Sequence, residues 1–184
     1  MVLQPGDTIS YRVNFLEMDT CPKFDWPVSQ SKDDTLIIEA QNPPAHYFFS
    51  LYEAVGSEYE WTDMYKVSKS QLNRFLNHKN VHFFSLVFKG WPGGFFILDN
   101  RRSDECDLTY FGLVPEATGQ GLGSYLLKFA VKKAWDFENV KKLTVNTNTL
   151  DHPLAFPLYK KVGFRLIRTI NDSRILSKPR FGKC

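Results

Sequence analysis

The sequence predicts a single domain of the α/β class. Its 184 residues are enough for one domain with a sizeable buried core. Patterns typical of strands and of helices succeed one another along most of the chain. At its centre, residues 107–128 read as a buried strand, a proline stop, a glycine-rich turn and a helix that begins at once. We expect this strand–turn–helix unit to carry the function.

The central unit has the composition of an anion-binding turn. Val, Leu, Tyr and Phe dominate residues 108–114, which suits a strand covered on both faces, and Pro115 ends it because proline cannot donate to a ladder. Gly119, Gly121 and Gly123 then let the backbone turn with bare N–H groups. Because a helix N-terminus combines unpaired amides with a positive dipole end, the turn is predicted to hold a phosphate.

The other elements follow from periodicity and from turn residues. The expected strands are residues 9–18, 35–40, 81–88, 94–100, 105–114, 141–147, 164–170 and 174–177, and the expected helices are residues 45–55, 68–78, 121–137 and a helix that starts near Pro153. Ser68 and Gln71 form a capping box, and residues 89–93 are expected to turn a hairpin. Asp151 or His152 is expected to cap the last helix. Of the first two strands, one is expected to begin the sheet and the other to form an added edge.

Composition argues against several classes of function. The formal net charge is only +3 and no basic run is interleaved with aromatic residues, so nucleic acid is not expected as a partner. No stretch approaches a membrane span, and the N-terminus has no signal pattern. Three widely spaced cysteines, Cys21, Cys106 and Cys184, favour reduced thiols and therefore a cytoplasmic protein.

The spacing of the glycines narrows the choice of phosphate ligand. A dinucleotide fingerprint fails because its third glycine would fall on Ser124 or Leu126. The nucleotide-hydrolase loop fails because Gly123 is followed by Ser-Tyr rather than by Lys-Ser or Lys-Thr. The string Thr-Gly-Gln-Gly-Leu-Gly at residues 118–123 instead resembles the Q/R-x-x-G-x-G/A signature of the GCN5-related N-acetyltransferases (GNAT), which wraps the pyrophosphate of acetyl-coenzyme A. Thr118 stands where the signature has Gln or Arg.

A second motif of the same family is resembled downstream. Residues 155–164, Ala-Phe-Pro-Leu-Tyr-Lys-Lys-Val-Gly-Phe, are similar to N-x-x-A-x-x-L-Y-x-x-x-G-F, with His152 in place of Asn. Residues 149–153 also resemble a bacterial subgroup of unknown substrate. The resemblance covers about residues 35–170. We therefore expect an N-terminal strand and loop packed on the domain at residues 1–34, the acetyltransferase domain at residues 35–178 and a tail at residues 179–184.

The resemblance implies a fold and a mode of cofactor binding. It implies a mixed sheet of six to seven strands with about four helices, splayed between the fourth and fifth core strands. The pantetheine arm of acetyl-CoA would pair with the open edge of the fourth strand, and no metal is implied. The implied cofactor-binding residues are Leu113, Val114, Thr118, Gly119, Gln120, Gly121, Leu122, Gly123, Ser124 and Tyr159.

The resemblance also implies catalytic roles. Tyr159 would protonate the departing thiolate, and an N–H near Gly112 would polarise the thioester carbonyl. The family's usual glutamate base aligns with Leu108, so Asp107 becomes the candidate base or amine anchor, provided that a bulge turns it to the correct face. The alternatives are that Tyr159 only packs under the cofactor and that Asp107 is a surface acid.

An aromatic and acidic segment between the first two helices would form the acceptor wall. Its candidate substrate-binding residues are Tyr52, Glu53, Trp61 and Asp63, which suit a cationic amine. Alternatively, the aromatic residues belong to the core and the acids to a solvated rim. The predicted activity is acetyl transfer from acetyl-CoA directly to a primary amine of a small molecule or peptide, and a homodimer is possible. The alternatives are a weak or inactive GNAT-fold sensor of coenzyme A, and an interaction module.

Overall fold

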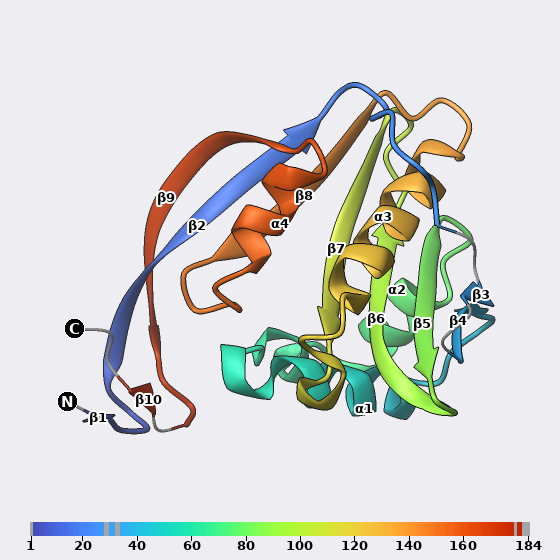
Figure 1. Cartoon of the computed structure of the whole chain (residues 1–184). Helices are drawn as coiled ribbons and strands as arrows, with labels where there is room; N and C mark the ends of the chain where they lie inside the picture. The colour runs from blue at the N-terminus through green and yellow to red at the C-terminus, as the bar shows by residue number, and fades with distance from the viewer. Residues whose placement is uncertain (1, 28–29, 32–33, 179, 182–184) are drawn as a thin grey trace.

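The computed structural model describes residues 2–27, 30–31, 34–178 and 180–181, and it is built around one mixed sheet (Figure 1). The strands are β1 (Val2–Leu3), β2 (Thr8–Met18), β3 (Gln30–Ser31), β4 (Thr35–Ala40), β5 (Val81–Phe88), β6 (Trp91–Asp99), β7 (Glu105–Leu113), β8 (Lys142–Asn148), β9 (Arg165–Ile175) and β10 (Arg180–Phe181). Eight of them form a sheet in the order β3-β4-β5-β6-β7-β8-β2-β9, and β1 pairs with β10. Apart from the two-residue β3, seven strands remain, so the predicted mixed sheet is confirmed.

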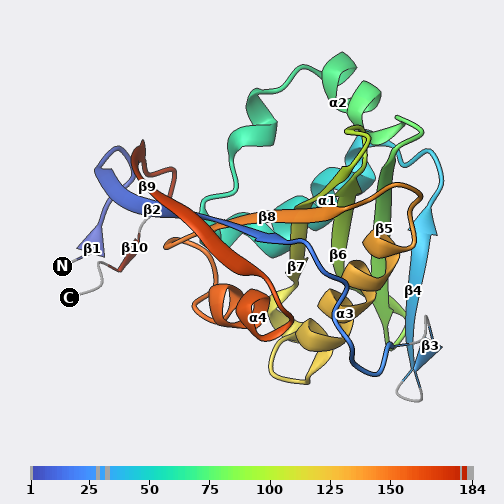
Figure 2. The ribbon, with the colours of Figure 1, turned by 90° about the horizontal axis from the view of Figure 1, so that it is seen from above.

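Four α-helices cover the two faces of this sheet. They are α1 (Ala45–Gly56), α2 (Lys69–Leu76), α3 (Leu122–Trp135) and α4 (Ala155–Lys161), with short 3-10 turns at η1 (Ser57–Tyr59), η2 (Asp63–Lys66) and η3 (Pro115–Ala117). Figure 2 shows α1 and α2 on one side of strands β5–β7 and α3 on the other. Apolar side chains of both helix layers meet those of the strands in one continuous core.

The N-terminal strand is an interior strand, which corrects the expectation of an added edge. β2 pairs antiparallel with β8 over Val13–Met18 of its length and with β9 over Thr8–Glu17. The strand that begins the other half of the sheet is β4, which pairs with β5. Local periodicity predicts that β2 is a strand, but its partners lie more than a hundred residues away and leave no local signal. β2 and β9 form the long arm that curves away at one side of Figure 1.

Two predicted boundaries are wrong, for the same physical reason. The turn between β5 and β6 is only Lys89-Gly90, both with positive φ, so residues 91–93 belong to β6 and Pro92 lies opposite Val87. Residues 171–173, which were expected to turn between strands 164–170 and 174–177, are also strand: Asp172 lies opposite Tyr11 and accepts a hydrogen bond from its hydroxyl. In both places pairing with a neighbouring strand overrides turn-forming residue types.

The helices agree more closely with prediction. Ser68 and Gln71 make the predicted capping box of α2 through both reciprocal hydrogen bonds. The helix α4 begins at Ala155, later than expected, and neither predicted residue caps it by a side-chain hydrogen bond. This late start places Pro157 in the first turn, where its missing N–H has no helical partner to lose. Of the expected tail at residues 179–184, only the pairing of β10 falls within the described residues.

Candidate active site

The sheet opens between β7 and β8, the one parallel pair among the described strands. Their pairing begins at Glu105 opposite Lys142 and ends at Asp107 opposite Thr144. β7 continues to Leu113 along β6, and β8 continues to Asn148 along β2, so each strand keeps its outer neighbour while the inner edges separate. The predicted splay is therefore confirmed, and it leaves peptide groups of β7 without a strand partner on one side.

The register of β7 decides which N–H groups face this gap. The Val114 N–H donates to the Gly93 carbonyl at 3.0 Å, toward β6. Since bonded pairs alternate along an antiparallel ladder, Gly112 also directs its peptide groups toward β6. The intervening residues, Phe111 and Leu113, therefore direct theirs toward the gap. The N–H predicted near Gly112 is therefore that of Phe111 or Leu113. The Val114 N–H is not available, because it donates to the Gly93 carbonyl.

The glycine-rich turn stands at the end of β7 with its amides free. Gly119 and Gly121 have φ values of +74° and +77°, and a Cβ built on either would meet nothing within 4 Å. The first N–H of α3 that bonds within the helix is that of Tyr125, to the Gly121 carbonyl. No described residue accepts a hydrogen bond from the N–H groups of residues 119–124. Neither a side-chain cap nor an acidic residue occupies the first turn of α3, so nothing competes with an anion there.

Two side chains of the signature hydrogen-bond to backbone carbonyls that precede the glycines of the turn. The Thr118 hydroxyl donates to the Pro115 carbonyl at 2.7 Å, and the Gln120 amide donates to the Glu116 carbonyl at 3.1 Å. Leu122 is buried and anchors the start of α3 in the core, whereas Ser124 is only half-buried. The turn is therefore held from within by the side chains that flank its exposed glycines.

Tyr159 lies under the opened edge. Its ring centroid is 6.0 Å from that of Phe111 on β7, and 5.9 Å from that of Phe164. Only 4% of the residue is exposed, and no described residue hydrogen-bonds its hydroxyl. Burial raises the pKa of Tyr159, and the nearby carboxylates of Asp151 and Asp107 act in the same direction. The phenol therefore stays protonated and able to donate.

Asp107 is brought to the α1 side of the sheet by a bulge. The register between β6 and β7 shifts so that Leu108 and Tyr110 lie opposite consecutive residues, with Thr109 as the extra residue. The shift puts Asp107 on the same face as Tyr110, the face covered by α1. The Asp107 carboxylate accepts hydrogen bonds from Thr144 at 2.7 Å and Thr109 at 2.9 Å. Burial raises its pKa, and these two hydrogen bonds oppose the shift.

Trp61 spans the open end of the gap, a contact that sequence reasoning did not predict. Its indole Nε1 donates to Asp151 at 3.2 Å, joining the loop after α1 to the end of β8. Asp151 is fixed in turn by the Thr147 hydroxyl and the Asn148 N–H, each at 2.8 Å. Gly56 makes room for the ring, because a Cβ there would lie 2.4 Å from the Trp61 Cβ. Ninety residues separate the two partners, so only the fold brings them together.

The four predicted acceptor residues do not form one wall. Tyr52 is 2% exposed and packs in the core, where burial raises its pKa to about 12. Glu53 is exposed on α1, and the Asp63 carboxylate is paired with Arg174 at 3.0 Å. Only Trp61 borders the gap: its ring lies 3.8 Å from a Cβ built on Gly112. His152 also serves structure, since its Nδ1 accepts the Leu154 N–H at 3.1 Å.

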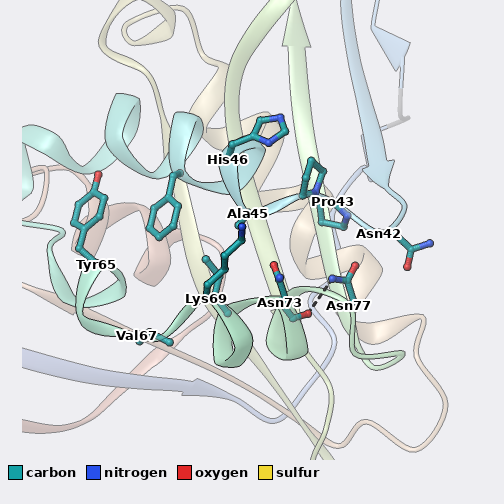
Figure 3. A pocket seen from close by; sticks show the side chains of 12 residues that line it. Asn42, Pro43, Ala45, His46, Tyr65, Val67, Lys69, Asn73 and Asn77 are labelled. Atoms are coloured by element: carbon teal, nitrogen blue, oxygen red, sulfur yellow. Dashed lines mark hydrogen bonds between the residues drawn. The ribbon is translucent and has the colours of Figure 1, made fainter.

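A separate cavity of about 740 Å³ lies between the start of α1 and α2 (Figure 3). Its lining includes His46, Phe49, Tyr65 and Lys69, and none of the predicted cofactor-binding residues. The α1 residues that approach the gap, Val55 and Gly56, are not part of it. The open sheet edge and this cavity are therefore different features of the surface.

A sheet opened beside a turn with free amides can accept an extended, phosphorylated ligand along a strand edge. Residues 48–164 match the model of the acetyltransferase (GNAT) family, and this match covers more than half of the chain. The protein belongs to the GNAT acetyltransferase family. No curated protein matches the chain.

Solved structures share this fold at low sequence identity. A GNAT family acetyltransferase from Elizabethkingia anophelis with acetyl-CoA bound has a TM-score of 0.54 at 20% identity, over 74% of this chain and 80% of that one. An aminoglycoside acetyltransferase from an uncultured soil metagenomic sample, in complex with sisomicin, has a TM-score of 0.56 at 13% identity, over 71% and 88%. A GCN5-related N-acetyltransferase from Kribbella flavida has a TM-score of 0.55 at 12% identity; 94% of this chain matches 59% of that longer one. Within the described residues, no helix is both long and apolar enough to cross a membrane.

Proposed function

We propose that the protein is an acetyl-CoA-dependent N-acetyltransferase that moves an acetyl group directly to a primary amine of a small molecule or peptide. The observation that carries the proposal is the open edge of β7 leading to a turn with free amides at residues 119–124. A diphosphate fits that turn, and an extended amide chain fits the edge of β7 as an added strand would. The acetyl-CoA-bound relative from Elizabethkingia anophelis supports the same cosubstrate.

The direction of the edge assigns a role to each free peptide group. From the turn, the chain of the cosubstrate would run back along β7 and meet Leu113 first and Phe111 second. Leu113 would bond a pantetheine amide, and the Phe111 N–H would point at the thioester carbonyl. A donor aimed at the oxygen where charge develops is worth about 3 kcal/mol when removed from other acyl-transfer sites. The thioester supplies the acetyl group and a thiolate leaving group.

Proton transfers complete the reaction. The amine nitrogen forms a bond to the carbonyl carbon while the carbon–sulfur bond breaks, so the nitrogen loses a proton and the sulfur gains one. Tyr159 would donate to the sulfur, since its ring contacts Phe111 and its hydroxyl keeps its proton. Asp107 would accept the amine proton, through water along the face that it shares with Tyr110. From the same position, Asp107 would alternatively bind the cationic amine before it reacts.

The amine would approach past Trp61. Its ring borders Gly112 and could hold a cation by its π-face, while Asp151 lies beside it as a fixed carboxylate. The similar fold of the aminoglycoside acetyltransferase solved with sisomicin supports a small-molecule amine as the acceptor of this protein. Exposed Glu53 and paired Asp63 would contribute only to the charge around the entrance.

The experiment that tests the proposal is a thiol-release screen with acetyl-CoA and a panel of polyamines, amino acids, aminoglycosides and peptides. We expect release that depends on one class of amine, with the acetylated amine identified by mass spectrometry. Calorimetry with acetyl-CoA accompanies the screen. Binding without release for every amine class would contradict transfer and favour the alternative, a sensor that binds coenzyme A without turnover. The sensor alternative is supported by Leu108, which stands where the family usually has a glutamate base.

A further inference from the structure

The strand β9 leaves a long edge of the sheet without a partner. In the described part of the chain β9 pairs only with β2, whereas the opposite edge, β4, is partly covered by β3. The β2–β9 register shifts once, between Phe15 and Leu16, and is regular from Arg168 to Ile175. β9 contains no proline, a residue that natural proteins place on edge strands to prevent pairing, and its charged residues are of both signs.

Apolar side chains gather on this same strand. Eight large hydrophobic side chains are exposed among the described residues, and four of them lie on β9: Leu166, Ile167, Ile170 and Ile175. Ile170, at the middle of the regular stretch, is 41% exposed. A strand edge of regular register that also exposes apolar residues is a template for pairing with another strand.

The residues around Ile170 are complementary to themselves in the antiparallel direction. A two-fold axis at Ile170 places Arg168 opposite Asp172 of a second copy, and Thr169 opposite its Asn171. Arg168, Ile170 and Asp172 alternate with the other two and therefore share one face of the strand. Each copy then contributes one cation and one anion to two identical ion pairs that flank an Ile170–Ile170 contact.

Both charged groups are already held over that face. The Arg168 guanidinium lies 4.3 Å above the centre of the Phe15 ring on β2, and Asp172 accepts the Tyr11 hydroxyl at 2.8 Å. About 13 Å of strand separates residues four apart, so the two charges cannot pair within one copy. We propose that β9 pairs with β9 of a second copy about a two-fold axis at Ile170, joining two sheets into one. The symmetric placement of Arg168 and Asp172 about Ile170 favours a second copy of this chain over a different protein, because only a second copy would match both charges through the same two-fold axis.

Sedimentation velocity across the micromolar range, with the unmodified chain, tests the proposal. We expect a dimer of twice the 21.3 kDa chain mass. Ile170→Lys puts two ammonium groups together at the axis and should give a monomer of unchanged circular dichroism. The matched control is Ile38→Lys on β4, where the isoleucine is 46% exposed, and it should remain dimeric.

A charge swap tests the register itself. Arg168→Asp or Asp172→Arg alone places like charges opposite each other and should raise the dimer dissociation constant at least tenfold. The double variant Arg168→Asp/Asp172→Arg restores opposite charges across the axis and should restore the dimer. If the single variants acted by damaging the chain, the double variant would be worse than either. A monomeric unmodified chain would assign the edge to another partner and overturn the proposal, as would a dimer that Ile170→Lys retains or a double swap that stays monomeric.

Discussion

At the scale of single residues, proton delivery depends on Tyr159. Its phenol is buried, protonated and in contact with Phe111, at the edge where the sulfur would lie. We expect Tyr159→Phe to lower kcat at least about tenfold, since general acids contribute one hundredfold or more in well-studied enzymes. The dissociation constant for acetyl-CoA should stay within a factor of about two, because the ring is kept. Steady-state rates and calorimetry measure the two quantities.

Tyr47→Phe is the control for this substitution. It also removes one hydroxyl from a partly buried tyrosine, whose hydrogen bond goes to Ser85 at 2.8 Å on the other half of the sheet. Its kcat should equal that of the unmodified enzyme. An unchanged kcat in Tyr159→Phe would remove that hydroxyl from the mechanism and leave it a packing role.

Asp107 should control the acid limb of the pH profile. Burial raises its pKa above the usual 3.8, and the base must be ionised, so kcat/KM should fall as pH drops through this raised pKa. Asp107→Asn should lower kcat/KM at neutral pH and abolish that limb. The free energy of unfolding should change in the opposite direction to the activity. Because folding raises the pKa of Asp107, the protein loses stability as pH rises from the pKa of this group in the unfolded chain through its pKa in the folded protein.

Glu105→Gln is the comparison for Asp107→Asn. Glu105 lies two residues earlier on the same strand and pairs with Arg102 and Lys142 near the surface. Its removal should keep the acid limb and move it slightly to lower pH, because the Glu105 carboxylate also raises the pKa of Asp107. A limb that survives in Asp107→Asn would assign the base to another group or to water.

At the scale of elements, the binding of phosphate by the turn at residues 119–124 can be tested separately from the stability of the turn. Gly121 has positive φ and open space around it, so Gly121→Asp strains the backbone by roughly 1 kcal/mol without a clash inside the protein. A carboxylate there would meet the diphosphate. We expect the dissociation constant for acetyl-CoA to rise at least about tenfold, or about 1.4 kcal/mol, by calorimetry.

Gly90→Asp is matched to this variant. Gly90 turns the β5–β6 hairpin with φ +85°, and a Cβ built on it would likewise meet nothing within 4 Å. The substitution should cost similar stability and leave acetyl-CoA affinity unchanged. Equal affinities in the two variants would show that the turn does not hold the phosphates.

The same turn shows which parts of the site are readable from sequence. Pro115 and the glycines that follow act through their own φ angles and missing N–H, so the strand, turn and helix are predicted correctly from local residues. The direction of each N–H along β7 is not local. It depends on pairing with β6, and the structure moves the gap-facing N–H from Gly112 to its neighbours.

At the scale of the whole molecule, long-range contacts are what sequence reasoning could not supply. The family fold and its splayed sheet were predicted from two motifs. The interior place of β2 arises from pairing with β8 and β9, and the span across the gap arises from Trp61 and Asp151. Such contacts join residues that local periodicity treats independently. They also explain why the predicted acceptor wall divides into core, entrance and gap.

The most direct test of the open edge is backbone amide hydrogen exchange measured by NMR, with and without coenzyme A. Only amides that face the gap or the turn should gain protection on binding: those of Phe111 and Leu113 and those of residues 119–124. The Gly112 amide, already directed at β6, should change little. Saturating coenzyme A that leaves these amides exchanging as fast as before would contradict a cosubstrate held by the edge of β7.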